Sequence, residues 1–529
     1  MLRSNHFTSL FINILIVAIT YTSYAQYPPF ATKISSEWVF FDTNEKLNYK
    51  TTVNGDKIMD FSHAGYMGGG VAIPDVPVKI TVNPTGKDDT ENIQSAINEV
   101  SKMEFSGNFR GAVMLAPGNY IISKTIEIST SGVVLRGSGS GLYGNIKSTL
   151  NLSGNPFNAI TIRAPRNSNE NENMHYQIQT QIADAYIPSG TYTFSVSNAG
   201  KFSAGDLISI DKPVTGKWIE FMQMHDLVRD GKPQTWLPLG SVLSTERQIV
   251  KISGNAITVD VSLTDSYDSD FLTPPGVIVR KINPLNRIAH SGVENMHIVS
   301  PPQPISHTQR HFTALRINGE DCWARNMFIE ETMNSVAVGG KRITVERVTV
   351  QRKALHQGSS RPAEFAPNGG QVLIDRCNVI ADNVWFVATG GKQSGPIVIL
   401  NCKFTGDLTA ESHQRWSTGM LYDNVRAETG GIDFRNRGSM GSGHGWSMGW
   451  GVAWNCVAKN FVIQNPPGVH NWMIGCIGEN IPKPRPFDQE PNLTGGTLDS
   501  HGIPVTPVSL YLAQLKERLG EQALKNIGY

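Results

Sequence analysis

The sequence predicts an all-β protein whose main body is a single-stranded parallel β-helix. A short motif returns eight times between Ser291 and Glu479, at intervals of 20 to 31 residues that suit one solenoid coil each. Period-two runs rich in β-branched residues surround it, as in Arg342–Val350 and Gln371–Val379. The 51 Gly and 29 Pro of the 529 residues supply the turns that many short strands need.

The repeated motif is an apolar residue, a variable residue, an anchor that is Asn, Arg or Gly, and an apolar or sulfur-containing residue. Each anchor is expected within a strand-like run, and stacking the coils in register brings the residues that follow the anchors into one interior ladder. Every member of this ladder is apolar or carries sulfur, which predicts burial. The anchors are Asn295, Asn326, Arg347, Arg376, Asn401, Asn424, Asn455 and Gly475, and the ladder is Met296, Met327, Val348, Cys377, Cys402, Val425, Cys456 and Cys476.

Charge and cysteine content exclude several classes of protein. The formal net charge is +1, from 46 basic and 45 acidic residues, so no nucleic-acid partner is expected. Four of the five cysteines fall in the ladder and Cys322 precedes a strand; free buried thiols are favoured over a disulfide between neighbouring rungs. No C-x-x-C spacing is present and no cofactor is predicted, while calcium stays an alternative without a clear ligand cluster. A monomer is expected.

The first residues have the pattern of a signal peptide. Arg3 precedes the apolar stretch Leu10–Ile19, and Ser23–Ala25 offers small residues for cleavage before Gln26. No later window is apolar over the length of a membrane span. We therefore expect residues 1–25 to be removed and the protein to be secreted, with periplasmic or cell-surface retention left open.

Residues 26–185 are interpreted as a lead-in, a cap helix and the first coils. Asp89 or Thr90 can cap a helix whose apolar stripe is Ile93, Ala96, Ile97 and Val100. Such a helix would cover the open end of the solenoid.

Three further regions follow. Residues 186–283 break the coil pattern and predict a β insertion with a turn at Gly254–Asn255; its segment Lys217–Pro238 either covers a cleft or is an ordinary packed loop. Residues 284–480 are the main coils, which carry the site. Residues 481–529 are a Pro-rich segment and a helix capped by Ser509, expected to lie against the solenoid or its C-terminal end.

Three motifs carry a family resemblance. They are D-D-T-x-x-I-Q-x-A-I at Asp88–Ile97, L-x-P-G-x-Y at Leu115–Tyr120 and G-V-x-L-x-G-x-G at Gly132–Gly139. Together they resemble the N-terminal part of the pectate-lyase-like superfamily of right-handed parallel β-helix proteins, which holds many polysaccharide lyases and some glycoside hydrolases. The resemblance implies a right-handed helix. It is specific for the fold and not for the reaction.

Basic residues recur at a similar offset after successive anchors, which predicts a cationic strip along the solenoid axis that could hold an anionic polysaccharide. Lys341, Arg342, Lys392 and His470 belong to this strip. With two nearby tryptophans, the residues expected to bind substrate are His307, Arg310, His311, His356, Arg361, Trp416, Arg435, Arg437 and Trp446.

Two loops combine His, Arg and Trp, namely Glu411–Trp416 and Arg435–Trp446. These residue types suit β-elimination on a uronic acid, where a base takes the C5 proton, an acid serves the leaving oxygen at C4, and an Arg offsets the carboxylate. The predicted catalytic residues are His413, Arg415 and His444. The predicted protein is a secreted polysaccharide lyase, with a sulfated ulvan-type polymer favoured and alginate or pectate as alternatives.

Two other functions stay open. A polygalacturonase-like glycoside hydrolase would need two carboxyl groups roughly 5 to 9.5 Å apart, for which Glu364, Asp407, Glu411 and Asp433 are available. A non-catalytic carbohydrate-binding β-helix would use the strip for recognition alone.

Overall fold

The computed structural model describes residues 34–142, 144–165, 178–283, 287–303, 309–354, 361–487 and 491–529. The described residues fall in one compact unit, Thr32–Tyr529, and the expected signal peptide lies outside them. Within the described ranges, no helix combines the length and apolar character needed to cross a membrane.

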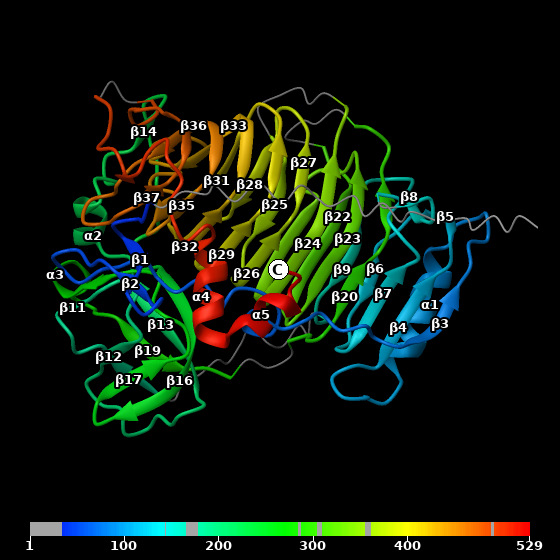
Figure 1. The fold of residues 1–529 in the computed structure, drawn as a ribbon, viewed down its shortest axis with the longest axis horizontal. Coiled ribbons are helices and arrows are strands. Elements are labelled where there is room, and N and C mark those ends of the chain that lie inside the picture. Colours follow the sequence, from blue (N-terminus) through cyan, green and yellow to red (C-terminus); the bar gives the residue numbers. More distant parts are fainter. Residues whose placement is uncertain are drawn as a thin grey trace, which may run out of the picture. The chain divides into compact units, whose positions relative to one another are not determined.

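The main body is a right-handed parallel β-helix, as predicted, in which strands of successive coils pair side by side (Figure 1). Each complete coil contributes strands to three faces. The first face runs through β3 (Val78–Val82), β4 (Gly111–Leu115), β7 (Val133–Gly137), β20 (Gly292–Glu294), β23 (Trp323–Glu330), β24 (Val336–Gln351), β26 (Gly370–Asp375), β29 (Ser394–Leu400), β32 (Ser417–Asp423), β35 (Val452–Trp454), β37 (Trp472–Ile474) and β39 (Thr497–Asp499), with β34 (Met448–Gly449) also pairing with β32.

The other two faces are built from the same coils, and long strands bend from one face to the next. The second face runs through β5 (Gly118–Ile122), β8 (Ser148–Leu152), β21 (His297–Val299), β23, β24, β27 (Asn378–Ile380), β30 (Lys403–Thr405), β33 (Arg426–Phe434), β36 (Val457–Ile463) and β38 (Ile477–Asn480). The third face runs through β6 (Ile126–Ile128), β9 (Asn158–Ile162), β22 (Thr313–Glu320), β24, β25 (Ala363–Pro367), β28 (Trp385–Thr389), β31 (Thr409–Ser412), β33 and β36.

The predicted interior ladder is confirmed. All eight residues have 0% of their surface exposed and belong to one apolar cluster inside the coils. All five cysteines are buried free thiols. Stacking apolar side chains along the axis removes them from water, and this burial is the main force holding successive coils together.

The anchors mark the bend from the first face to the second. Asn326 and Arg347 lie within the long strands β23 and β24, as predicted, whereas the other six stand between two strands. All eight have positive φ, from 49° at Asn401 and Asn455 to 65° at Gly475. Asn and Gly tolerate this left-handed conformation better than other residues do, which explains most of the motif. At the first of these bends, Nδ2 of Asn326 donates to Oδ1 of Asn295 in the preceding coil at 3.1 Å.

The β insertion is a separate antiparallel sheet that begins slightly earlier than predicted. Its strand order is β10 (Gln179–Gln181), β19 (Ile278–Lys281), β13 (Leu207–Pro213), β16 (Val242–Ser253), β17 (Ala256–Val259) and β12 (Thr193–Ser195). Ser253 pairs with Ala256, so Gly254–Asn255 forms the expected two-residue turn. Around the sheet lie β11 (Tyr186–Ile187) paired with β18 (Tyr267–Asp268), β14 (Val228–Arg229) paired with β15 (Lys232–Pro233), and the short helices α2 (Gly216–Phe221) and α3 (Ser269–Leu272).

Helices cover the solenoid at two places. The cap helix α1 (Thr90–Ser101) buries the predicted stripe against β3, β4, β6 and β7. At the C-terminus, Ser509 caps α4 (Leu510–Leu519) as expected, accepting from Leu512 N at 3.2 Å, but Gly520 at φ 79° separates it from α5 (Glu521–Asn526). Both helices lie across the solenoid near β26 and β29 (Figure 1), beside a lead-in that contains β1 (Val39–Phe41), β2 (Leu47–Tyr49) and the 3₁₀ turn η1 (Tyr66–Gly68).

Candidate active site

The candidate site lies where strands of the third face end and their turns begin. Ala388 of β28 pairs with Glu411 of β31, and Glu411 pairs with Asp433 of β33. Thr389 pairs with Ser412, so His413 is the first residue beyond the β31 strand. Strand pairing thus brings side chains from three successive coils to one place on the outer surface of the face.

Glu411, His413 and Arg437 form a connected cluster. Nδ1 of His413 lies 2.6 Å from Oε1 of Glu411, and Nη1 of Arg437 donates to the same oxygen. Nη1 of Arg437 also lies 2.7 Å from Nδ1 of His413. Glu411 and Arg437 are 2% and 3% exposed, whereas the His413 side chain is 22% exposed. Of the three groups, His413 is the one that solvent or substrate can reach.

Two aromatic rings frame His413. The Trp385 ring lies edge-on with its centroid 5.2 Å away, and the His444 ring centroid lies 5.0 Å away. Burial in these surroundings lowers the pKa of His413 to about 4. Burial, reinforced by the positive charges of nearby groups, lowers the pKa of His444 to about 3. Both imidazoles are therefore neutral near pH 7.

The tautomer of His413 is assigned from its contact with Glu411. A carboxylate only accepts hydrogen bonds, and the contact of Nδ1 with the Glu411 anion is shorter than its contact with Nη1 of Arg437. We therefore assign the Nδ1 proton to the bond with Glu411. Nε2 then carries the free lone pair. Because Arg437 already offsets the charge of Glu411, the carboxylate orients His413 while leaving it unprotonated. The arrangement holds an unprotonated ring nitrogen in a fixed orientation, which is what a general base requires.

Several guanidinium groups lie near His413. Cζ of Arg361 and Cζ of Arg437 lie 5.7 and 5.0 Å from the Trp385 ring centroid. Burial and the nearby Arg361 charge lower the pKa of Arg437 to about 10. Arg361 is exposed and has no carboxylate partner among the described residues. An anion bound between Trp385 and His413 would relieve this repulsion.

Arg415 borders the same site from the other side. Its Nη2 donates to the carbonyl and to the hydroxyl of Ser442 at 3.1 and 2.7 Å, and its backbone N–H donates to the carbonyl of His444. These bonds join the two loops that the sequence singled out. Arg435 lies half-buried next to them, with Nη1 3.9 Å from Asp433. His413, Arg415, Arg435, Arg437 and His444 thus share one region of the surface.

The two predicted aromatic platforms require correction. Trp416 is 2% exposed, donates from Nε1 to Asp265 at 2.9 Å and packs against Trp218 and Trp236 of the insertion, so it offers no face to a sugar. Trp446 is 3% exposed and donates to the Met222 carbonyl. The segment Lys217–Pro238 therefore packs its aromatic residues beneath the site, while Nη1 of Arg229 reaches the Gly441 carbonyl at 3.3 Å.

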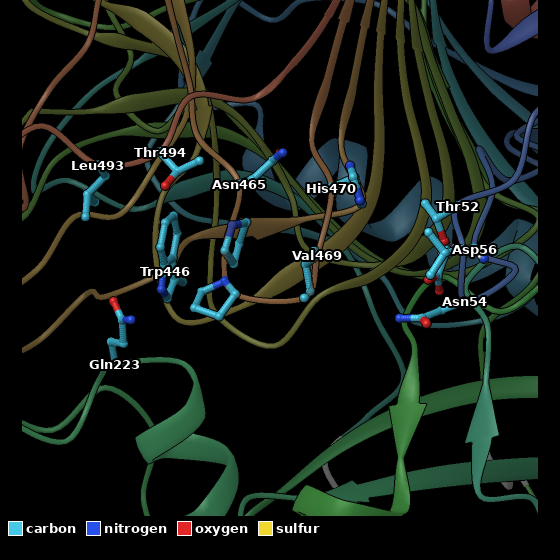
Figure 2. Close-up of a pocket in the computed structure, with 14 residues that line it drawn as sticks. Thr52, Asn54, Asp56, Gln223, Trp446, Asn465, Val469, His470, Leu493 and Thr494 are labelled. Carbon is cyan, nitrogen blue, oxygen red and sulfur yellow. Dashed lines mark hydrogen bonds between the residues drawn. The ribbon is translucent and has the colours of Figure 1, made fainter.

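Trp446 does line part of a neighbouring hollow, which Figure 2 shows together with Asn465, Val469, His470 and Thr494. The cavity measures about 440 Å³. Nδ1 of His470 lies 2.9 Å from the Thr497 hydroxyl, and burial lowers its pKa. Asn465 and His470 belong to the turn between β36 and β37, which follows the Arg435–Trp446 turn along the solenoid.

The remaining residues of the predicted strip fall in different surroundings. Arg310 is exposed, and Nε2 of the half-buried His311 lies 2.7 Å from Nδ2 of Asn334 near the start of the third face. Lys341 and Arg342 are tied up in ion pairs, with Glu246 and with Glu320 and Asp321. Lys392 lies beside Arg415, where burial and the Arg415 charge lower its pKa. His307 and His356 lie outside the described residues.

The carboxylates named for a hydrolase are poorly placed for that role. Glu411 and Asp433 are neighbours in register but are 2% and 4% exposed, and Glu411 is bound to Arg437. Glu364 is fully buried and bonds the Ser335 hydroxyl. Asp407 is exposed, but its Oδ1 accepts from Asn383 N at 2.6 Å. Among the described residues, no group of three or more His, Cys, Asp or Glu side chains is arranged to hold a metal ion.

Trp385 was not predicted from the sequence as a site residue. It starts β28 a full coil before His413, and only the pairing of β28 with β31 brings the two rings together. In the sequence, Trp385 stands in the apolar run Val384–Val387, where an aromatic residue of the core is expected. The available signal was the coil spacing: Ala363, two residues after Arg361, pairs with Trp385 in the next coil.

The fold is a parallel β-helix. Comparisons with protein-family models and with curated proteins give no match. Among solved structures, the tailspike protein gp49 from Pseudomonas phage LKA1 is 13% identical with a TM-score of 0.37, and the match covers 74% of this chain and 56% of the tailspike. The chain thus spans little more than half the length of that protein.

Two enzymes show a similar likeness. The polygalacturonase from Erwinia carotovora ssp. carotovora is 11% identical with a TM-score of 0.34, covering 82% of this chain and 98% of its own. The A-module of the Azotobacter vinelandii mannuronan C-5 epimerase AlgE6 is 9% identical with a TM-score of 0.30, covering 85% and 100%. These likenesses concern the fold alone.

Proposed function

We propose that this protein is an exported polysaccharide lyase that cleaves a uronic-acid-containing anionic polysaccharide by β-elimination. The observation that carries the proposal is His413: a neutral, partly exposed imidazole oriented by Glu411 and surrounded by arginines. Elimination needs a base beside a carboxylate that must be neutralised, and this site combines both requirements.

In the proposed reaction, Nε2 of His413 removes the proton from C5 of the uronate. The electrons of the C5–H bond form the C4=C5 double bond, and the C4–O bond breaks. The leaving oxygen at C4 receives a proton, and the imidazolium of His413 can return the one it has taken, because a group whose pKa lies near 4 is a good acid once protonated. No water is added in this sequence.

The arginines supply electrostatic stabilisation. Arg361 is exposed beside Trp385, so it can pair with the uronate carboxylate in the ground state and with the extra charge that develops as the C5 proton leaves. Arg415 flanks the opposite side through its bonds to Ser442. Arg437 has a different task, since it is buried and holds Glu411. His444 packs against His413 and completes the wall of the site.

The hydrolase alternative is less well supported because its carboxylates are buried or already hydrogen-bonded. The masses of the products distinguish the two reactions. A lyase yields fragments whose masses sum to that of the starting polymer. A gain of one water per cleaved bond would overturn the proposal in favour of hydrolysis, and intact polymer with measurable binding would favour the non-catalytic alternative.

The substrate class is a polymer that carries carboxylate, with ulvan-type sulfated polymers favoured over alginate and pectate because guanidinium groups bind sulfate as well as carboxylate. Ulvan, alginate and pectate are therefore the substrates to compare in that assay.

A further inference from the structure

A second hollow lies on the outer surface of the third face, several coils before His413. Its volume is about 310 Å³. The lining comes from β6, β9, β22 and β24 and from residues next to β6, β9 and β25, and its charged members are Glu127, Arg163 and Arg316. Two of the three are guanidinium groups, so the lining carries a net positive charge.

Arg316 in this hollow has free hydrogen-bonding capacity. It is exposed, and its Nε donates to Oδ1 of Asn158 at 2.8 Å. Its terminal nitrogens have no carboxylate partner in the described part of the chain. Arg163 instead donates to Glu127 at 2.8 Å, which offsets that carboxylate. One unneutralised guanidinium therefore faces the hollow, flanked by the amide of Asn318.

Strand register connects this hollow to the candidate active site. Arg316 pairs with Ala337, which pairs with Ala366. Phe365 pairs with Val387, which places Ala366 beside Ala388, and Ala388 pairs with Glu411. Three alanines thus separate Arg316 from Glu411 along one row; Ala337 and Ala366 are partly exposed, whereas Ala388 is 6% exposed.

A second row runs parallel to the first. Asn318 pairs with Gly339, and the pairing of Val338 with Pro367 places Gly339 beside Asn368. The backbone N–H of Gly390 donates to Oδ1 of Asn368 at 2.6 Å, and the pairing of Thr389 with Ser412 places Gly390 beside His413. Glycine and amide side chains therefore lead from the hollow to the base. Amides can bond the hydroxyls of a sugar chain.

We infer that Arg316 forms a distal subsite that binds an anionic group, carboxylate or sulfate, of the same polysaccharide chain that reacts at His413. The inference rests on the proposed function and deepens it. Four strand spacings separate Arg316 from Glu411, about 19 Å along the axis, a length that a short extended oligosaccharide covers. The enzyme should then act on long chains better than on short ones, and the added affinity should come from charge.

The test compares Arg316→Gln with wild type on size-defined oligosaccharides from ulvan, alginate and pectate. On long oligosaccharides of the polymer that is cleaved, the variant should lose about 10-fold to 100-fold in kcat/KM through a higher KM, the usual effect of removing a charge-assisted hydrogen bond. On disaccharides and trisaccharides it should match wild type, because these cannot reach Arg316. Long oligosaccharides with reduced carboxyl groups, and others with their sulfate removed, show which anion Arg316 binds. If removing one of these groups abolishes the difference between variant and wild type, that group is the bound anion.

Lys403→Gln is the matched control, because it removes one exposed positive charge from β30 on the second face of the solenoid. It should leave both kinetic constants unchanged. An equal loss in Arg316→Gln on short and long chains, or no loss on either, would overturn the subsite.

Failure of the proposed function has a different signature. Calorimetric titration of His413→Ala protein with the same long oligosaccharides measures binding without turnover. If wild type eliminates nothing while Arg316→Gln in that background still weakens binding of long chains, the subsite stands and the lyase assignment falls. If elimination occurs and Arg316→Gln leaves the binding of long chains unchanged, the lyase assignment stands and the subsite falls.

Discussion

Nδ1 of His413 lies 2.6 Å from Oε1 of Glu411, two residues earlier in the same segment. The strand end exposes one side chain and buries the other, so the carboxylate can orient the imidazole from beneath. Arg437, from the next coil, closes the cluster by donating to the same carboxylate oxygen. The geometry leaves Nε2 as the one ring nitrogen directed to a ligand.

The first prediction concerns His413 itself. His413→Ala should lower kcat by roughly 10² to 10⁴, the usual contribution of a general base, with little change in KM. His444→Ala should have a smaller effect, because His444 contacts His413 through ring packing only. Steady-state kinetics on the cleaved polymer measure both effects.

The control for this pair is His225→Ala, which removes an exposed histidine of the insertion. It should behave as wild type. Near-normal turnover in His413→Ala would contradict the role given to the histidine and direct attention to other bases near Arg361.

The second prediction is the pH dependence of the rate. The base acts when unprotonated, and burial lowers the pKa of His413 to about 4. The acidic limb of kcat/KM should therefore have its midpoint near pH 4 rather than near 6.5. The same shift affects folding: the unfolded chain binds the proton more tightly, so the stabilising contribution of neutral His413 is full above pH 6.5 and is lost as pH falls toward 4.

Profiles of kcat/KM measured between about pH 3 and about pH 8 test this value, within the range where circular dichroism shows the protein folded. A midpoint near 6.5 would mean that His413 is not desolvated in the free enzyme, and the structural basis given for its neutrality would be wrong.

The third prediction concerns Glu364 and stability. Burial raises its pKa from 4.5 to about 7. Because the folded state holds this proton more tightly than the unfolded state, stability falls as pH rises from about 4.5 to about 7 and is level beyond it. Glu364→Gln keeps a neutral partner for the Ser335 hydroxyl and should remove this part of the pH dependence. Urea unfolding of both proteins at several pH values measures this difference. If the unfolding free energies of the two proteins change with pH in the same way, the raised pKa of Glu364 is contradicted.

The fourth prediction concerns an anchor. Asn424 has φ 53°, and its Nδ2 donates to the Val508 carbonyl at 3.0 Å. Asn424→Ala and Asn424→Gly both lose that bond, but only alanine is strained in the left-handed region. The alanine variant should be less stable than the glycine variant by roughly 1 to 2 kcal/mol. Equal unfolding free energies would show that the backbone conformation does not select the anchor residue.

The repeating part of the fold was predictable from the sequence because its constraints are local. Each coil needs a residue that tolerates positive φ, followed by one that fits the interior, and both leave a mark in the sequence, as at Asn401 and Cys402. The exact place of the anchor was not predictable, because a bend between two short strands and a continuous strand show the same apolar pattern.

The site was predictable only in part. Spacing from the anchors predicted that His413, Arg415 and Arg437 lie near one another, because equal offsets on stacked coils occupy equal positions, and Nη1 of Arg437 does lie 2.7 Å from Nδ1 of His413. Tertiary contacts decide which aromatic side chain is exposed at the site. Trp416 is buried because Trp218 and Trp236 of the insertion pack against it. Those contacts join segments about 180 to 200 residues apart, and a local pattern carries no trace of them.

The central claim is elimination by an oriented histidine, and the formation of the conjugated alkene tests it most directly. Wild-type protein incubated with ulvan, alginate or pectate should produce a rising ultraviolet absorbance from the C4=C5 double bond beside the carboxylate, and His413→Ala should slow that rise by roughly 10² to 10⁴ on the same polymer. Shorter chains that accumulate without any new absorbance, or a His413→Ala protein that forms the alkene at the wild-type rate, would contradict the account.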